Sequence, residues 1–206
     1  AGDYIFRTFP RDGFAPKALY DFISSQHQKF GIISEQTDYA QGFADSFMES
    51  NKEGKVEIIN EDYMSKETDF RSLLLRLKSA KIEGLFINSQ TELAFLAILK
   101  QAKKMGMDIQ IYGAYWPGSK TFLDKAGSLA EDINYVDLPS VSDVLSEDGL
   151  KLFNEFEGKY GKINSIELIF ATTFESLRAL HQAIQSRKDP REYLYNTTFN
   201  GLFGNW

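Results

Sequence analysis

The sequence predicts an α/β protein built on a doubly wound parallel sheet. Apolar runs of strand length alternate with stretches in which apolar residues recur at helical spacing. Short polar loops join these segments, and the helical stretches run to about three turns, enough to cross from one parallel strand to the next. Because such crossovers are right-handed and cover both faces of a sheet, we expect one sheet with helices on either side.

The N-terminal part of the chain contains three predicted strands and the helices between them. Tyr4–Thr8 is predicted as a short strand, and Ala15–Ser25 carries apolar residues at helical spacing. Lys29–Ser34 is a compact apolar run of strand length, followed by a helix that places the apolar residues of Phe43–Met48 on one face. A third strand is predicted at Lys55–Ile59.

The pattern continues through the middle of the chain. Thr68-Asp69 can cap a helix whose apolar residues, Phe70 to Leu77, face a core. Ile82–Asn88 follows as a strand, Thr91–Met105 has the clearest helical pattern, and Ile109–Gly113 returns to strand. The middle of the chain is therefore one layered unit.

The pattern changes after Leu138-Pro139. Two helical stretches, Glu147–Tyr160 and Ser165–Ser186, follow each other without a strong strand between them. We therefore place a domain crossing near Pro139.

Composition and charge exclude several classes of protein. Of the 206 residues, 43% are hydrophobic and 14% aromatic, which is typical of a globular domain. The formal net charge of −6 provides no general attraction to phosphate backbones or anionic lipid, so we expect no nucleic-acid partner. No apolar run approaches the roughly 20 residues of a membrane-spanning helix. The absence of cysteine excludes disulfides, thiolate metal sites and a cysteine nucleophile.

The sequence shows no recognisable catalytic set, cofactor loop or metal cluster, so we expect a binding protein without a cofactor rather than an enzyme. Gly113–Thr121 approaches a phosphate-binding loop, but Ser119 stands where the lysine must follow the second glycine. Pro117 also removes an amide from the cradle. His27 and His181 have no partner at metal or triad spacing, which favours surface or packing roles for both.

The loops that follow three of the predicted strands carry the candidate binding residues. These residues are Tyr39, Ser89, Gln90, Thr91, Tyr115 and Trp116. In a parallel sheet such loops emerge at the carboxyl ends of the strands, where ligands of these folds bind. We therefore expect them to meet on one edge and to line one wall of a ligand site. Loop aromatics can equally be packing residues, and that alternative stays open.

Several short motifs occur in a familiar order over nearly the whole chain. They are Phe6-Arg7-Thr8, Gly31-Ile32-Ile33, Asp38-Tyr39-Ala40-Gln41-Gly42, Thr68-Asp69-Phe70, Leu73–Lys78, Leu99–Gly106, Phe156–Gly161, Phe174-Glu175-Ser176 and Gly201–Gly204. In this order and spacing the chain resembles type I periplasmic solute-binding proteins, and most of all the branched-chain amino-acid (Leu/Ile/Val) receptors of ABC uptake transporters. The resemblance implies a periplasmic-binding-protein-like fold with one complete lobe plus part of a second.

The resemblance also implies a division of the chain. Residues 10–139 would form the second lobe, and residues 1–9 and 140–206 would belong to the first, whose remaining strands and helices we expect to lie outside this chain. Two such lobes close on a ligand by a hinge motion. The implied protein is exported to the periplasm or the cell exterior by a signal peptide upstream, and its partners are a small-molecule ligand and the membrane permease of an ABC transporter.

The resemblance assigns roles to three of the candidate residues. Tyr39 matches a family tyrosine that packs against the ligand, and Thr91 falls where some amino-acid binders have an aromatic residue. Tyr115 falls where amino-acid binders place the glutamate that pairs with the ligand ammonium. Because a buried ammonium without an anionic partner is costly, this departure puts an ordinary amino acid in doubt. Tyr115 and Trp116 could instead hold a cation over their rings or stack on an aromatic ligand.

Two functions from different classes follow. The first is a solute-binding receptor of an uptake system. The alternative is a regulatory, sensor or scaffold protein that reuses the same fold to contact another protein, because a fold alone does not fix a function. An enzyme comes third.

Overall fold

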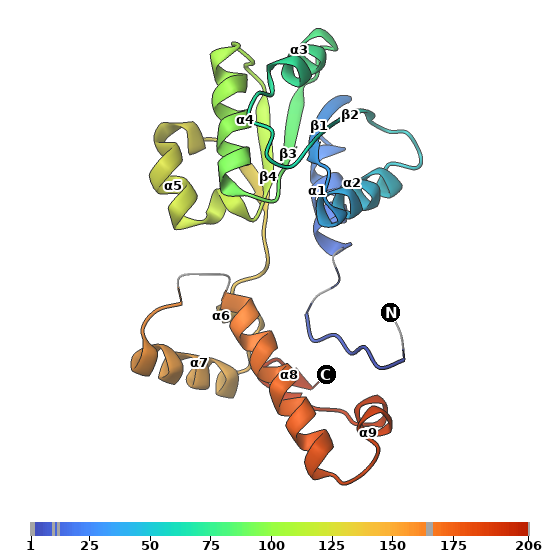
Figure 1. Ribbon diagram of the computed structural model, residues 1–206, viewed down its shortest axis with the longest axis vertical. Helices are drawn as coiled ribbons and strands as arrows, with labels where there is room; N and C mark the ends of the chain where they lie inside the picture. The colour runs from blue at the N-terminus through green and yellow to red at the C-terminus, as the bar shows by residue number, and fades with distance from the viewer. Residues whose placement is uncertain (1–2, 10, 12, 164–166, 206) are drawn as a thin grey trace. The chain divides into compact units, whose positions relative to one another are not determined.

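The computed structural model describes residues 3–9, 11, 13–163 and 167–205, which form two compact units (Figure 1). The first, the sheet unit, spans Asp12–Asp137. The second, the helical unit, combines Ala1–Arg11 with Leu138–Trp206. Pro10, where the predicted second lobe begins, and Ser165, where a predicted helix begins, lie outside the described residues.

The sheet unit alternates strands and helices along the chain. Its elements are α1 (Phe14–Ile23), β1 (Lys29–Glu35), α2 (Asp38–Ser50), β2 (Glu57–Tyr63), α3 (Arg71–Ser79), β3 (Gly84–Asn88), α4 (Glu92–Lys104), β4 (Gln110–Ala114), the 3₁₀ turn η1 (Trp116–Gly118), α5 (Lys120–Ala126), the 3₁₀ turn η2 (Gly127–Ala130) and β5 (Asn134–Val136). Five strands form one sheet in the order β2-β1-β3-β4-β5, and every neighbouring pair is parallel. The winding reverses between β1 and β3, which confirms the predicted doubly wound sheet.

The central strands alternate their side chains between two cores, as the pleat requires. Phe30 and Ile32 of β1 join a core that is covered by α1 and α2. Ile33 joins the core that is covered by α3, α4 and α5. Figure 1 shows these two helix layers on opposite faces of the sheet. Because both faces are covered, the central strands read as nearly unbroken apolar runs in the sequence.

Three helices of the sheet unit begin with a side-chain cap. The hydroxyl of Thr37 accepts from the amide of Ala40 at the start of α2, and Thr91 does the same for Ala94 at the start of α4. Ser119 caps α5. Each cap satisfies an amide that would otherwise lack a partner and contributes about 1 kcal/mol. The helices following β1, β3 and β4 therefore start at fixed positions beside the carboxyl ends of those strands.

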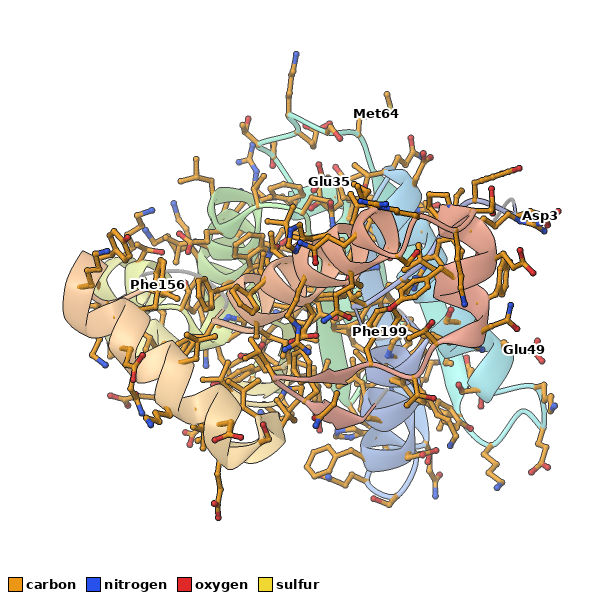
Figure 2. All side chains as sticks on the ribbon, turned by 90° about the horizontal axis from the view of Figure 1, so that it is seen from below. Asp3, Glu35, Glu49, Met64, Phe156 and Phe199 are labelled. Carbon is orange, nitrogen blue, oxygen red and sulfur yellow. The ribbon has the colours of Figure 1, made fainter. Side chains whose placement is uncertain are left out.

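The helical unit contains α6 (Val141–Val144), α7 (Glu147–Tyr160), α8 (Glu167–Gln185), α9 (Pro190–Asn196) and a short antiparallel pair, β6 (Asn200–Gly201) and β7 (Gly204–Asn205). Phe156 of α7, labelled in Figure 2, packs against Phe170 of α8, with 4.3 Å between the centroids of the two rings. Buried Glu175 of α8 accepts a 2.6 Å hydrogen bond from the amide of Leu202, which joins the β6–β7 turn to α8.

Two predicted strands differ from the structure, and one strand of the sheet was not predicted. The strand predicted at Tyr4–Thr8 is wrong, because residues 4–8 form no strand. The hydroxyl of Thr8 instead donates to the carbonyl of Thr172 on α8 and lies 2.6 Å from that of Ser176. The strand predicted at Lys55–Ile59 runs from Glu57 to Tyr63 instead. Strand β5 was not predicted at all. At α3 the N-cap residue Phe70 makes no side-chain cap, but the carboxylate of Asp69 accepts from the amide of Arg71 at 3.2 Å, so the predicted cap is confirmed for Asp69.

Candidate functional site

The buried polar side chains of the sheet unit gather in one place. Among the described residues of this unit, the buried polar or charged side chains are Ser34, Glu35, Asn88 and Ser89. They lie at and just beyond the carboxyl ends of β1 and β3, the two strands between which the winding reverses. Open parallel sheets bind their ligands at this switch point. We call this edge of the sheet, with the loops that follow β1, β3 and β4, the rim.

Asn88 joins β3 to β1 and α2. Its side-chain amide donates to the hydroxyl of Ser34 at 3.0 Å and to the carbonyl of Ala40 at 2.7 Å. Ser34 and Asn88 are also register partners in the parallel pair. Both amide hydrogens of Asn88 therefore have acceptors, as a buried amide requires. These two hydrogen bonds fix the first turn of α2 relative to the carboxyl ends of β1 and β3.

Glu35, labelled in Figure 2, is the last residue of β1 and is only 5% exposed. Its carboxylate accepts hydrogen bonds from the backbone amide of Gln90 at 2.8 Å, the hydroxyl of Ser65 at 2.8 Å and the hydroxyl of Tyr63 at 3.3 Å. Burial, followed by the neighbouring Glu35 carboxylate, raises the pKa of Tyr63, so that phenol stays a donor. One carboxylate thus connects the loops that follow β1, β2 and β3.

The aromatic residues of the rim contact each other and the β3–α4 loop. The hydroxyl of Tyr39, at the start of α2, donates to the hydroxyl of Tyr115 at 3.1 Å. The indole N–H of Trp116 donates to the carbonyl of Ser89 at 3.0 Å. Tyr39 is 40% exposed, and Tyr115 and Trp116 are partly exposed. These rings therefore have fixed hydrogen-bonding ends and accessible surface.

The backbone at Tyr115 is strained. Its φ of 61° and ψ of −56° resemble a classic γ-turn, a conformation that costs a non-glycine residue about 1–3 kcal/mol. The surrounding bonds hold it: its amide donates to the carbonyl of Val136 at 2.9 Å, and its carbonyl accepts from the amide of Gly118 at 3.3 Å. Strain of this kind clusters at ligand sites, and here it fixes where the Tyr115 ring lies.

A second carboxylate fixes the loop after β4. Glu92, in the first turn of α4, accepts hydrogen bonds from the hydroxyls of Thr121 and Ser119 and lies 3.2 Å from the ammonium of Lys125. The hydrogen bond from Thr121, followed by that from Ser119, lowers the pKa of Glu92 below its usual range. The start of α5 is therefore joined to the start of α4, close in sequence to Trp116.

The structure brings most of the predicted site residues together and shows one to be engaged elsewhere. Tyr39 contacts Tyr115, Trp116 contacts Ser89, and Gln90 contributes its amide to Glu35. The hydroxyl of Thr91 instead caps α4. Thr91 lies on the predicted edge, but its polar group has a helix-stabilising partner.

Sequence reasoning missed three residues of the rim: Ser34, Glu35 and Asn88. Each ends an apolar run, as in Ile32-Ile33-Ser34-Glu35 and Phe86-Ile87-Asn88. A polar residue at the end of a strand that is buried on both faces is the signal that could have found them, because such a group needs internal partners.

The weaker motifs have packing roles in the described part of the chain. A Cβ on Gly113 would approach the ring of Pro117 to 2.6 Å, and Pro117 is buried, so this loop is filled by its own side chains. His27 lies 2.7 Å from the hydroxyl of Tyr112, and burial lowers its pKa. His181 is exposed on α8. Within the described ranges no three acidic or histidine side chains are grouped so as to hold a metal ion.

Two concavities lie away from the rim. One of about 330 Å³ is at the opposite, amino edge of the sheet, and its lining includes Glu83, Lys103 and Asp108. The other, of about 350 Å³, lies within the helical unit and is lined by residues that include Tyr4 and Phe199. Neither includes a rim residue. The rim is the stronger candidate, because it combines the switch point with buried, hydrogen-bonded polar groups and accessible aromatic rings.

Comparison with known proteins gives consistent results. A family model described as periplasmic binding protein matches residues 1–206. The Leu/Ile/Val/Thr-binding protein of Salmonella typhimurium is 24% identical over 198 residues, which cover 91% of this chain and 51% of that protein. The chain thus spans about half the length of this curated relative. No helix among the described residues is both long and apolar enough to cross a membrane.

Solved structures share the fold. A leucine-binding protein from Thermotoga maritima matches with a TM-score of 0.81 at 18% identity, over 98% of this chain and 60% of that chain. A solute-binding protein from R. palustris, solved in complex with benzoate, matches with a TM-score of 0.74 at 17% identity, over 99% of this chain and 58% of that chain. At these identities the likeness establishes the architecture, which is the one the sequence predicts.

Proposed function

The chain belongs to the periplasmic binding protein family, and we propose that it acts as an extracytoplasmic solute-binding receptor for an ABC uptake transporter. The rim is the observation that carries this proposal. Its buried polar side chains have hydrogen-bond partners within the sheet unit, while its aromatic rings keep accessible surface. Such a surface is organised before a ligand arrives, which reduces the entropy lost on binding. We assign Tyr39, Ser89, Gln90, Thr91, Tyr115 and Trp116 to one wall of the ligand site.

The division of the chain supports roles for its two units. We assign the sheet unit, Asp12–Asp137, to the complete second lobe, since its sheet has the full alternation of strands and helices. We assign the helical unit to part of the first lobe. The relatives and solved structures are longer than this chain, which agrees with a first lobe that is only partly represented.

Membership of the family indicates where the protein acts and with which partners. Its members are solute-binding proteins rather than enzymes, and the curated relative is named for binding leucine, isoleucine, valine and threonine. We therefore propose that the protein is exported to the periplasm or the cell exterior, binds its solute without turnover or a cofactor, and delivers it to the membrane permease of an ABC transporter. The comparisons do not favour the regulatory or scaffold alternative.

Titration calorimetry tests the proposal. We expect the protein to bind at least one member of a panel of amino acids, amides and aromatic acids. At a free ligand concentration of about 100 times Kd, binding adds about 2.7 kcal/mol to the free energy of unfolding, so a thermal shift provides an independent readout. No binding and no shift across the panel, with a folded protein by circular dichroism, would refute the receptor function.

A pair of variants tests the position of the site. Trp116→Ala removes a rim ring and should weaken binding roughly two- to thirtyfold, the range of one aromatic contact. Phe14→Ala is the matched control, because Phe14 is an aromatic residue of the same unit that is 68% exposed and lies at the start of α1. If both variants bind like the unaltered protein, the solute does not contact this part of the rim.

A further inference from the structure

The two carboxylates that hold the loops of the rim, those of Glu35 and Glu92, already have partners. Glu35 accepts from Gln90, Ser65 and Tyr63 and is almost fully buried. At 5% exposure the carboxylate offers almost no surface to a further partner. A ligand ammonium could therefore reach this charge only if the loops that cover it moved apart and their hydrogen bonds to Glu35 were disturbed.

Glu92 is engaged in the same way. It accepts from the hydroxyls of Ser119 and Thr121, and the ammonium of Lys125 lies 3.2 Å away. Its charge is already balanced by Lys125, and its side chain is only 16% exposed. A second cation near Glu92 would meet the repulsion of Lys125.

The remaining acids at this edge are exposed. Asp38 lies in the first turn of α2, beside Tyr39, and Asp137 follows β5. Asp62, after the middle of β2, accepts from the side-chain amides of Gln41 and Asn60. An ion pair with an exposed carboxylate contributes little in water, so Asp38 and Asp137 are poor substitutes for a buried anionic partner.

The accessible surface of the rim is aromatic. The indole N–H of Trp116 is used by the carbonyl of Ser89, and the hydroxyl hydrogen of Tyr39 is used by Tyr115. The polar ends of these two side chains are thus engaged within the protein, and their rings offer carbon surface to a ligand. Rings of this kind stack on aromatic groups, whereas a primary ammonium needs hydrogen-bond acceptors and a counter-charge to leave water.

Resting on the proposed receptor function, we propose that the solute presents an uncharged aromatic ring to this rim and carries no ammonium group there. The ligand class is therefore aromatic compounds that lack the α-ammonium of an amino acid. The two tyrosines meet at their hydroxyls, and this contact, with the indole hydrogen bond to Ser89, holds the aromatic side chains in place for such a ring.

Four probes separate the two features of the proposed ligand. 3-Phenylpropanoate and phenylalanine differ only in the α-ammonium, and 4-methylpentanoate and leucine form the same pair without the aromatic ring. By calorimetry with the full chain, we expect 3-phenylpropanoate to bind most tightly. Adding the ammonium should weaken binding roughly tenfold or more, and replacing the ring by the aliphatic group should weaken it roughly two- to tenfold.

Variants at the rim test the cause. Tyr115→Glu supplies a carboxylate and should raise the affinity for phenylalanine relative to 3-phenylpropanoate by roughly tenfold or more. Tyr115→Phe removes the hydroxyl contact with Tyr39 but adds no charge, so it should weaken both compounds alike and leave the ratio of their affinities unchanged. Asp38→Asn and Asp137→Asn should also leave that preference unchanged, because neither exposed acid serves as an ammonium partner.

The outcomes separate this inference from the receptor function. If phenylalanine or leucine binds at least as tightly as its desamino partner, or if Asp38→Asn or Asp137→Asn weakens amino-acid binding, the protein is still a receptor and the ligand class is wrong. A quaternary ammonium such as carboxymethyl-trimethylammonium binding in preference to all four probes would also overturn the class. If none of the four probes binds but another compound of the calorimetry panel does, its chemistry decides. A bound compound that has an aromatic ring and no ammonium group supports the inference, and any other bound compound overturns it. If nothing binds, the receptor function fails, and the ligand class with it.

Discussion

Replacing Glu35 with glutamine removes the charge at the centre of the rim without changing the size of the side chain. The carboxylate accepts three hydrogen bonds within the sheet unit. A glutamine can keep its carbonyl oxygen toward the amide of Gln90 and the hydroxyl of Tyr63, and its NH₂ group then faces the hydroxyl of Ser65, which must accept instead of donate. Hydrogen bonds to a charged group contribute about 1.5–3 kcal/mol each, and neutral ones about half as much. We expect Glu35→Gln to lower the free energy of unfolding by about 1–3 kcal/mol.

Calorimetric melting measures this loss. For a chain of this size, about 1–3 kcal/mol corresponds to a fall in Tm of roughly 2–12 °C. Glu49→Gln is the matched control: Glu49 is an exposed residue of α2, labelled in Figure 2, and its replacement should leave Tm nearly unchanged. A second readout is the emission of Trp116 in a Trp206→Phe background, since Trp116 bonds to Ser89 beside Gln90. A Glu35→Gln protein that melts with the control and keeps the emission spectrum would refute the role of Glu35.

Two further predictions concern stability outside the rim. Burial lowers the pKa of His27 from 6.5 in the folded protein, against a smaller opposing effect of Glu83, so the unfolded chain takes up a proton first as pH falls. Stability should therefore be complete above about pH 6.5 and decline below it, and urea denaturation should show a flatter profile for His27→Gln but not for the exposed His181→Gln. In α7, Gly149→Ala should destabilise by about 1–3 kcal/mol, because its Cβ would lie 2.4 Å from the carbonyl oxygen of Leu202. Gly158→Ala on the same helix meets nothing within 4 Å and should stabilise by about 0.5–1 kcal/mol in chemical denaturation, so equal effects of the two would contradict the packing.

The central strands were predictable because they are buried on both faces. β1 and β3 bury nearly every residue, so their apolar runs stand out in the sequence. The edge strands were not predictable to the same degree. β5 is mostly exposed and only three residues long, and β2 contains the polar run Asn60-Glu61-Asp62 before it ends at Tyr63. An edge strand is defined by its hydrogen bonds to one neighbour, which leave little trace in hydrophobic pattern.

Of the candidate site, the accessible aromatic residues could be predicted from the sequence and the buried carboxylate could not. Tyr39, Tyr115 and Trp116 were found because loops after parallel strands share one edge, which needs only the strand directions. Glu35 was missed, because its burial depends on which strands are neighbours. Only when β1 lies between β2 and β3 do Tyr63 and Gln90 both reach its carboxylate. The strand order is set by packing of the whole unit and is not written in any single segment.

The buried carboxylate of Glu35 is better explained by geometry than by stability. A buried charge is a weak source of stability, and well-packed apolar replacements often stabilise a core as much or more. An apolar side chain at this position would, however, leave the backbone amide of Gln90 and the hydroxyl of Ser65 without their acceptor. The position of Gln90 in turn fixes the neighbouring carbonyl of Ser89, to which Trp116 is bonded. The carboxylate of Glu35 therefore keeps the ends of β1, β2 and β3 and their loops in a single arrangement. That arrangement is the one that positions the aromatic side chains of the rim.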